Sequence, residues 1–525
     1  MDESKAKCFQ GNRETMSKKK DSCVDIIEMT AGEIHDARRD GRVTFEKVAR
    51  AYLEQIEAHN DKLNAVITAN TDAPDRAAEL DAVWDDNGPI SPVHGVPVLV
   101  KDNTDTHDMP TTAGSVLFEG TVPPDDAYIL SQLRDVGAVV IAKTNLGEFS
   151  SGSLSSLGGQ TRNPYDLSRD TGGSSAGTGA GIAANFGVLG IGTDTGGSVR
   201  LPSGFCNLVG LRPTTGLLSR DGIIPLSDTQ DTAGPMTRTV ADAAKMMDAM
   251  VGYDPTDSWT SRIRSNVPES YTDYLIEDGL EGRRLGVVRQ FFGPKTNEGN
   301  EPNREAQAVT DVIEQALDDM AEAGAEIVDS VEIPEMETTV AESDVIEFVG
   351  KFNSKVIKLE FNREMNRYLD SLGDDAPIDS AQEILESGTL EGYIPLEEYV
   401  ETGTIPPEDH DDYFQTIAFR QALRQHILDT LEDNDLDALV YPTASRITSK
   451  IDEDRLYRTS SNTRIAPYTA LPAMTVPGGF DPIWETPVGV EFIAGPFEEP
   501  TLFELGYAYE HASNNRTPPE DFRTI

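Results

Sequence analysis

The feature that most constrains the fold of this chain is a segment rich in glycine and serine that runs from residue 147 to residue 216. Two loops stand out in it: residues 172–177 read GGSSAG, and residues 190–200 read GIGTDTGGSVR. Glycine destabilises regular elements because its backbone loses the most freedom on folding. So many glycines in one segment predict a close approach of the backbone. The approach is either to a ligand or, in the structural alternative, to helices packed beside two tight turns.

One chemistry that uses glycine-rich loops is phosphate binding. Gly179, Gly181 and Ala184 satisfy the spacing G-x-G-x-x-A, but the dinucleotide motif requires a strand immediately before its first glycine. Residues 173–178 read GSSAGT there, and no P-loop pattern with its lysine is present in the sequence. The match is therefore interpreted as accidental.

A second chemistry is the nucleophile elbow of α/β-hydrolases. Residues 173–177 fit G-x-S-x-G, which would make Ser175 the nucleophile. That motif also requires a strand before it, whereas residues 165–171 are polar and turn-like. It further requires a later acid and histidine. The later histidines stand in no distinctive sequence setting; they are His410, His426 and His511.

A third chemistry is a serine nucleophile served by a lysine base. A serine hydroxyl needs such a base, and a lysine can act as one only if burial or a nearby cation lowers its pKa. Lys101 follows the apolar run Val96–Val100, at the carboxyl end of a predicted strand, where open α/β sheets place their sites. Lys143 follows Ala138–Ala142 in the same way. Local sequence does not choose between them, and either could be an exposed lysine that ends a strand.

Short apolar runs alternate with amphipathic segments along most of the chain. A first helix is expected after Thr30, which has capping-box spacing with Glu33. Apolar periodicity predicts three further helices, at 45–56, 127–134 and 309–321. Strands are expected at 96–100, 138–142, 285–288, 326–328, 438–441, 474–476 and 490–493. The alternation predicts the α/β class with a mostly parallel or mixed central sheet.

The sequence predicts one domain over residues 26–525, preceded by a disordered tail at 1–25. The tail is polar and locally basic, unlike the rest of the chain, and Met16 is an alternative start. The chemistry-bearing core spans about residues 85–250. Residues 340–430 have helical patterns without strand signals, and we interpret them as a mainly helical insertion.

The balance of charges indicates the setting in which the protein works. Asp and Glu number 91 and Lys and Arg 44, which gives a formal net charge of −47. Because the acidic residues are spread along the chain, they predict a halophilic protein whose surface charges are screened by salt. The charge also argues against direct nucleic-acid binding, although less so in a halophile, where even tRNA-binding proteins can be acidic.

Cysteine usage and hydropathy predict a cytoplasmic protein without a membrane span. The cysteines Cys8, Cys23 and Cys206 form no disulfide framework and no metal-binding spacing. The longest nearly apolar stretch, residues 181–192, is too short and too rich in glycine to cross a bilayer. No apolar signal-peptide region follows the first charged residues.

Taken in order, these motifs resemble the amidase signature family over nearly the whole chain after the tail. The resemblance is densest from residues 94–103 (HGVPVLVKDN) to residues 231–236 (DTAGPM). It includes TTAGS at 111–115, KTN at 143–145, both serine loops and, near the carboxyl end, LPAMTVPG at 471–478. It implies the amidase signature fold, a large mixed central sheet covered by helices on both faces, with a mainly helical insertion.

The resemblance also implies a Ser-cisSer-Lys triad. In it, Lys101 is the neutral base, Ser174 follows a cis peptide bond and bridges the other two residues, and Ser198 is the nucleophile. Ala176 departs from the serine or glycine more usual in the family. No metal and no organic cofactor is implied.

Further residues receive supporting roles from the same resemblance. Backbone N–H groups of one loop would form the oxyanion hole; its residues are Thr195, Gly196, Gly197 and Ser198. Ser175, Asp194 and Arg200 would support the site. A substrate pocket would be lined by the helical insertion and by segments around Gly114–Ser115 and Ser150–Ser156.

Within the family, the sequence is more similar to the peptide-amidase-like branch than to the amidotransferase branch. Residues 158–168, 220–233 and 498–502 and the helical insertion carry this similarity. The resemblance thus implies an amidase that hydrolyses a small linear amide through an acyl-enzyme. Two alternatives stay open. One is the A subunit of glutamyl-tRNA(Gln) amidotransferase, a glutaminase that supplies ammonia; the other is a non-catalytic binding scaffold. The identity of the amide and the oligomeric state are left open.

Overall fold

The computed structural model describes residues 24–293, 302–333, 345–387, 400, 403, 405–451 and 461–523. Eleven strands form one mixed sheet in the order β1-β3-β2-β6-β8-β7-β12-β13-β11-β9-β10. Their bounds are β1 Val66–Ala69, β2 Pro97–Lys101, β3 Val139–Thr144, β6 Leu189–Thr193, β7 Val209–Arg212, β8 Ala233–Thr237, β9 Arg284–Val287, β10 Glu326–Val328, β11 Ala438–Pro442, β12 Ala473–Phe480 and β13 Pro487–Ile493. The short strands β4 (Leu154–Ser155) and β5 (Gly159–Gln160) pair separately.

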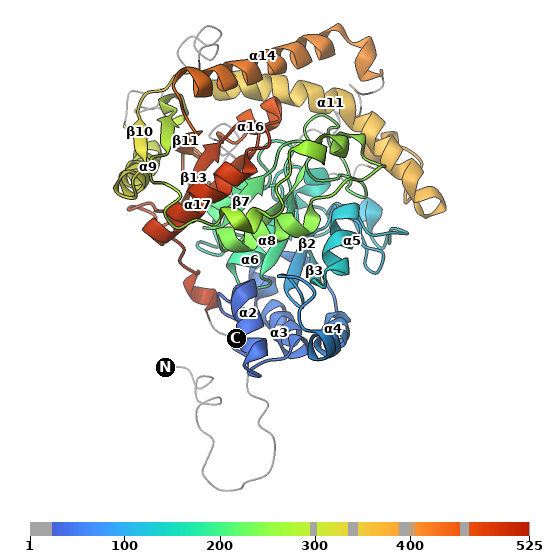
Figure 1. Ribbon diagram of the computed structural model, residues 1–525. Coiled ribbons are helices and arrows are strands. Elements are labelled where there is room, and N and C mark those ends of the chain that lie inside the picture. The colour runs from blue at the N-terminus through green and yellow to red at the C-terminus, as the bar shows by residue number, and fades with distance from the viewer. Residues whose placement is uncertain are drawn as a thin grey trace.

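Helices cover both faces of this sheet (Figure 1). Within the described residues, one row of helices packs in the order α5, α8, α17 and α9. Of the other helices, α3 packs on β1, β2 and β3, α6 on β2, β3, β6 and β8, and α7 on β7, β12 and β13. The bounds are α2 Ala31–Arg39, α3 Phe45–Leu63, α4 Ala73–Asn87, α5 Tyr128–Asp135, α6 Ala176–Ala183, α7 Arg200–Phe205, α8 Val240–Met250, α9 Arg304–Glu322, α11 Val345–Leu372, α12 Gln382–Glu386, α14 Asp411–Asp433, α16 Ile465–Thr469 and α17 Glu499–Ser513. The α/β fold class is as the sequence predicts.

The first two helices, α2 and α3, form where capping residues and apolar periodicity predict them. Thr30 accepts a hydrogen bond from the Glu33 N–H, and the Glu33 carboxylate accepts one from the Thr30 N–H, so the capping box at the start of α2 is confirmed. Helix α3 begins after an N-cap at Thr44 and buries the apolar face that contains Phe45, Val48 and Tyr52. Such faces lie in the main hydrophobic cluster of the molecule.

Every strand expected from apolar runs is present, with ends shifted by a few residues. Strands β1, β6, β7 and β8 were not expected. In β6 the sequence LGIGT alternates with glycine and resembles a loop. The packing explains the glycine: a Cβ at Gly190 would lie 2.6 Å from Thr178 Cγ2 in α6. Helix α6 therefore packs directly on the backbone of β6, which is the close approach that the glycine-rich segment predicts.

The register of three central strands brings the chemically important segments together. Strands β2 and β6 are parallel, with Val100 opposite Ile191, so their carboxyl ends lie side by side. Strand β8 runs antiparallel to β6, with Ala233 opposite Thr193. Consequently the ends of β2 and β6 and the start of β8 meet at one edge of the sheet.

The part of the chain predicted as an insertion contains long helices in the residues that the structure describes. Helices α11 and α14 pack against each other and extend across the top of the molecule in Figure 1. From α11, Phe361 and Met365 join a second hydrophobic cluster with Phe118 and Phe149. The predicted tail, except for residues 24 and 25, lies outside the described residues. None of the described helices has the length and the apolar character needed to cross a membrane.

Candidate active site

Lys101 is the last residue of β2, and its side chain is completely buried. Its Nζ donates hydrogen bonds to Ser174 Oγ at 2.8 Å and to Thr193 Oγ1 at 2.6 Å. Burial lowers the pKa of this ammonium group to about 7, although Asp194 and Asp231 act to raise it. A substantial fraction of Lys101 is therefore neutral near physiological pH, as a lysine base requires.

Lys143 is equally buried but lies in a different environment. The parallel register places Lys101 opposite Thr144, and Lys143 opposite Val100, so the two lysines point to opposite faces of the sheet. Lys143 Nζ donates to Thr104 O at 2.8 Å, Pro110 O at 3.1 Å and Thr111 Oγ1 at 2.6 Å, and it pairs with Asp102 at 3.4 Å. Lys143 thus fixes the loop after β2 and does not contact the serine loops.

The loop before α6 carries the two serines that local sequence could not rank. The Gly173–Ser174 peptide bond is cis, as the resemblance implied. Ser174 Oγ faces Lys101, whereas Ser175 Oγ is buried and exchanges hydrogen bonds with the backbone of Thr193, at 3.3 Å to its carbonyl and 3.2 Å from its N–H. No strand immediately precedes this loop among the described elements. Ser175 therefore lacks the exposed strand-to-helix position of a nucleophile elbow.

Ser198 lies in the loop between β6 and α7 and is half-buried. Its carbonyl oxygen accepts a hydrogen bond from the Ser175 N–H at 3.2 Å, which joins the two serine loops. The structure thus brings Lys101, Ser174 and the Ser198 loop together. Within the described residues, a hydrogen bond joins Lys101 to Ser174, but none joins Ser174 to the Ser198 hydroxyl.

The loop expected to form the oxyanion hole is folded around Asp194. The Gly197 N–H donates to Asp194 Oδ1 at 2.8 Å, so this group is already bonded, in contrast to the expectation that it would face a substrate. The N–H groups of Thr195, Gly196 and Ser198 have no acceptor among the described residues. Gly197 has φ +118°, and a Cβ there would lie 1.8 Å from Thr463 Oγ1, so only glycine fits.

Two arginines hold Asp194 in a fully buried ion network. Arg200 Nε donates to Asp194 Oδ2 at 3.1 Å, and Arg212 Nη1 contacts Asp194 Oδ1 at 3.0 Å. Burial alone would raise the pKa of Asp194, but Arg200, Arg212 and the Gly197 N–H outweigh it and lower the pKa to about 2. Asp194 is therefore ionised at all relevant pH values, and it fixes the far end of the loop by accepting hydrogen bonds from the N–H groups of Gly197 and Val199.

Sequence analysis missed Glu491, which completes this network from β13. Its carboxylate pairs with Arg200 Nη1 and accepts hydrogen bonds from Tyr441 OH and Thr475 Oγ1, each at 3.0 Å. The signal in the sequence was a single charge inside the apolar run PVGVEFI at 487–493. A buried carboxylate in such a strand needs a buried cation, and Arg200 is that cation.

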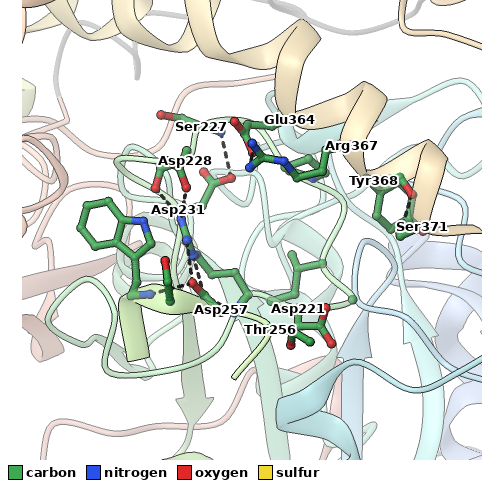
Figure 2. A pocket seen from close by; sticks show the side chains of 16 residues that line it. Asp221, Ser227, Asp228, Asp231, Thr256, Asp257, Glu364, Arg367, Tyr368 and Ser371 are labelled. Atoms are coloured by element: carbon green, nitrogen blue, oxygen red, sulfur yellow. Dashed lines mark hydrogen bonds and ion pairs between the residues drawn. The ribbon is translucent and has the colours of Figure 1, made fainter. Parts of the chain in front are cut away.

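A cavity of about 300 Å³ (Figure 2) has Asp231 in its wall, and Asp231 accepts a hydrogen bond from Thr195 of the loop after β6. Its walls come from residues 220–231 and 256–259 and from α11, which contributes Glu364, Arg367, Tyr368 and Ser371. A smaller cavity is lined by Thr193, Thr195 and Ser150 and shares Arg220, Ile223 and Asp231 with the larger one. Helix α11 of the insertion lines the larger cavity and Ser150 the smaller one, while Gly114 and Ser115 line neither of these two cavities.

The family model described as Amidase matches residues 47–503, which is most of the chain. The chain belongs to the amidase family. The resemblance to amidase signature proteins is thereby confirmed, and the protein is an enzyme that hydrolyses amides.

This amidase is similar in structure to the native peptide amidase from Stenotrophomonas maltophilia, with a TM-score of 0.82 and 33% identity over 94% of this chain and 98% of that chain. It is 30% identical to the A subunit of glutamyl-tRNA(Gln) amidotransferase from Thermoanaerobacter pseudethanolicus, over 95% of this chain and 99% of that protein. The structure of the A subunit from Thermotoga maritima is similar with a TM-score of 0.72 and 26% identity, over 95% of this chain and 98% of that chain.

Proposed function

We propose that this amidase hydrolyses a linear carboxylic amide with Ser198 as nucleophile and with Ser174 and Lys101 as the proton relay. The observation that carries the proposal is the buried contact of 2.8 Å between Lys101 Nζ and Ser174 Oγ. It lies beside the half-buried Ser198 and involves a lysine whose pKa burial lowers to about 7. A serine needs a base of this kind to attack an amide.

The proposed reaction has two halves. Neutral Lys101 accepts the Ser174 proton while Ser174 accepts the Ser198 proton, and Ser198 Oγ attacks the amide carbonyl carbon. The proton returns through Ser174 to the leaving nitrogen as the C–N bond breaks, which releases ammonia or an amine and leaves an acyl-ester on Ser198. Water then attacks the ester by the same relay, releasing the acid and restoring the hydroxyl.

The loop after β6 would stabilise the oxyanion that forms on the carbonyl oxygen. Of its four N–H groups, Gly197 is bonded to Asp194, so we assign the role to the N–H groups of Thr195, Gly196 and Ser198. One such preorganised donor is typically worth about 3 kcal/mol in the transition state. The network around Asp194 keeps these donors in place without contacting the substrate.

We assign substrate binding to the cavity of about 300 Å³ beside the site. Its lining is polar: Arg220 is held by Asp257 through two contacts of 2.9 Å, and Arg367 pairs with Glu364 at 2.8 Å. A cavity of this size and polarity suits a small polar amide. The insertion helix α11 forms one of its walls, so it would contribute to the choice of substrate.

A hydrolase is favoured over an amidotransferase component by structural similarity. The TM-score to the peptide amidase, 0.82, is higher than the TM-score to the A subunit from Thermotoga maritima, 0.72. Hydrolysis of a panel of peptide amides and aryl amides by the purified chain alone, in molar salt, would support the hydrolase. Release of ammonia from glutamine only when partner subunits are added would instead identify a component of an amidotransferase.

A fluorophosphonate probe tests the catalytic residues without knowledge of the substrate. We expect the probe to label the wild-type chain, and Ser198→Ala to abolish labelling and hydrolysis with the fold retained. Lys101→Ala should lower the turnover of an amide substrate to near the background rate. Full activity in either variant would refute the assignment.

A further inference from the structure

Asp231, two residues before β8, contacts the oxyanion loop although it belongs neither to the proposed triad nor to the network around Asp194. Its Oδ1 accepts a hydrogen bond of 2.5 Å from Thr195 Oγ1. Its Oδ2 accepts from the N–H groups of Leu226, at 2.7 Å, and Ser227, at 2.9 Å. All three donors therefore point at one carboxylate, which is 9% exposed and lies where the two cavities meet.

Thr195 is held at several points, and Asp231 is one of them. The neighbouring Gln230 donates from Nε2 to the Thr195 carbonyl at 2.9 Å. Thr232 and Asp194 exchange two backbone hydrogen bonds of 2.8 and 3.3 Å, which keep segment 230–232 beside the start of the oxyanion loop. Because Thr195 begins that loop, a rotation of its backbone would move the N–H groups of Thr195 and Gly196 together.

Asp231 is connected to the base of the proposed relay through the wall of the small cavity. The small cavity that it lines is also lined by Thr193, whose hydroxyl contacts Lys101 Nζ at 2.6 Å. The charges that act on Lys101 are those of Asp194 and Asp231, while its polar neighbours Ser174 and Thr193 are neutral. Asp194 forms direct ion pairs with Arg200 and Arg212, whereas Asp231 interacts electrostatically with Arg220 and Arg212 and forms no ion pair among the described residues.

We propose that Asp231 is a positioning residue of the hydrolytic centre: its carboxylate fixes Thr195 at the start of the oxyanion loop and places a second negative charge opposite Lys101. This inference rests on the proposed function. It has two separable consequences. Loss of the hydrogen bond misplaces oxyanion donors and slows attack. Loss of the charge makes the Lys101 ammonium less stable, which lowers the pKa of Lys101.

The experiment measures the rate at which a fluorophosphonate probe labels the full-length chain in molar KCl, from about pH 5 to about pH 9. Thr195→Val removes the hydroxyl at nearly constant shape, and Thr195→Ser restores it. We expect Thr195→Val to lower the maximal labelling rate about tenfold and Thr195→Ser to stay within about twofold of wild type. A Thr195→Val variant that labels at the wild-type rate would overturn the positioning role.

Asp231→Asn tests the charge. We expect a lower maximal rate and an acid limb of the pH profile that moves down by about half a pH unit or more, because Lys101 loses a stabilising anion. A purely structural residue would leave the acid limb in place, and that result would overturn the proposal. The matched control is Asp435→Asn, which removes the same charge from a side chain that is 98% exposed and should leave the profile unchanged.

Two further measurements keep the outcomes distinct. Thermal unfolding of each variant shows whether it folds, and if Asp231→Asn does not, the comparison of Thr195→Val with Thr195→Ser decides. Wild-type labelling that is lost in Ser198→Ala supports the proposed function independently. If that labelling is present and the Thr195 and Asp231 variants behave as wild type, only the present inference fails.

Discussion

Two fully buried lysines stand at the ends of neighbouring strands with very different partners. Lys143 has four oxygen acceptors and an anion, Asp102, so its charge is compensated on all sides. Lys101 has two hydroxyl partners and no direct ion pair among the described residues. A buried ammonium with so little compensation gives up its proton readily. Because burial lowers the pKa of Lys143 as well, the two lysines differ at the scale of single residues in their partners: Lys143 pairs with Asp102, whereas Lys101 contacts Ser174.

The pH dependence of activity should report Lys101. Its pKa is lowered to about 7 by burial, and only the neutral amine can accept the Ser174 proton. We expect kcat/KM to rise with pH through a midpoint near this value and then to level off. The measurement is the hydrolysis rate of an amide at low substrate concentration across pH. The outcome that would contradict control by Lys101 is an acid limb centred near the pKa of a carboxylate and found at the same pH in the wild-type chain and in Asp231→Asn.

Replacement of the two lysines by methionine should separate structure from catalysis. Lys143→Met leaves the Asp102 charge buried without its cation, which should lower the free energy of unfolding by about 3–5 kcal/mol. Lys101→Met removes a poorly compensated cation at similar volume, so we expect a change below about 1 kcal/mol together with loss of activity. Urea unfolding of both variants in molar salt measures the difference. Equal destabilisation by the two replacements would contradict it.

At the scale of elements, helix α11 is tied to the active-site loops by one buried carboxylate. Glu360 accepts hydrogen bonds from the Ser227 hydroxyl, from Thr229 N and Oγ1, both at 3.2 Å, and from Tyr413 OH of α14 at 2.7 Å. Ser227 donates its N–H to Asp231, which accepts from Thr195, so three successive hydrogen bonds connect the insertion to the oxyanion loop. The insertion is thus coupled to the shape of the catalytic centre as well as to the cavity wall.

Removal of this carboxylate should weaken both stability and catalysis. Glu360→Ala leaves several buried donors without an acceptor, and we expect the free energy of unfolding to fall by about 3 kcal/mol or more. Glu360→Gln keeps one acceptor oxygen and the shape of the side chain, so its loss should be smaller. Unfolding in urea and probe labelling of Ser198 measure the two effects. An alanine variant as stable and reactive as wild type would show that α11 docks independently of this contact.

At the scale of the whole molecule, the net charge of −47 sets the conditions under which the fold is stable. Repulsion among surface carboxylates destabilises a compact chain at low ionic strength. At molar salt concentration, screening shortens the range of this repulsion to about 3 Å. The catalytic centre differs from the surface because its charged groups are buried, among them Lys101 and the ion pair of Asp194 with Arg200. Salt should therefore affect the fold more than the chemistry of the site.

The melting temperature should rise with salt. We expect an increase of about 10 °C or more between low and molar KCl, because screening relieves repulsion in the folded state. A non-ionic osmolyte at matched osmolality serves as the control, since it favours the compact state without screening charge. Calorimetry or circular dichroism measures the shift. A melting temperature that is independent of KCl would contradict a halophilic surface.

By itself, the sequence determined the α/β class, the apolar strands and the presence of two serine loops, because hydrophobic periodicity and glycine content are local properties of the chain. It did not reveal β6, because Gly190 interrupts the apolar pattern typical of a strand. Glycine is needed at that position because helix α6 packs directly on the backbone there. An apolar run indicates a strand only where the strand packs through its side chains, whereas β6 packs on helix α6 through its backbone.

Only the tertiary structure decided which residues meet. Lys101 and Lys143 have the same local setting, and the register of β2 and β3 turns them to opposite faces. Glu491 reaches Arg200 from β13, 291 residues away in sequence, and Asp231 reaches Thr195 from the segment before β8, 36 residues away. Burial, strand register and long-range hydrogen bonds set the pKa of Lys101 and the orientation of Gly197, and these quantities arise only when distant segments fold together.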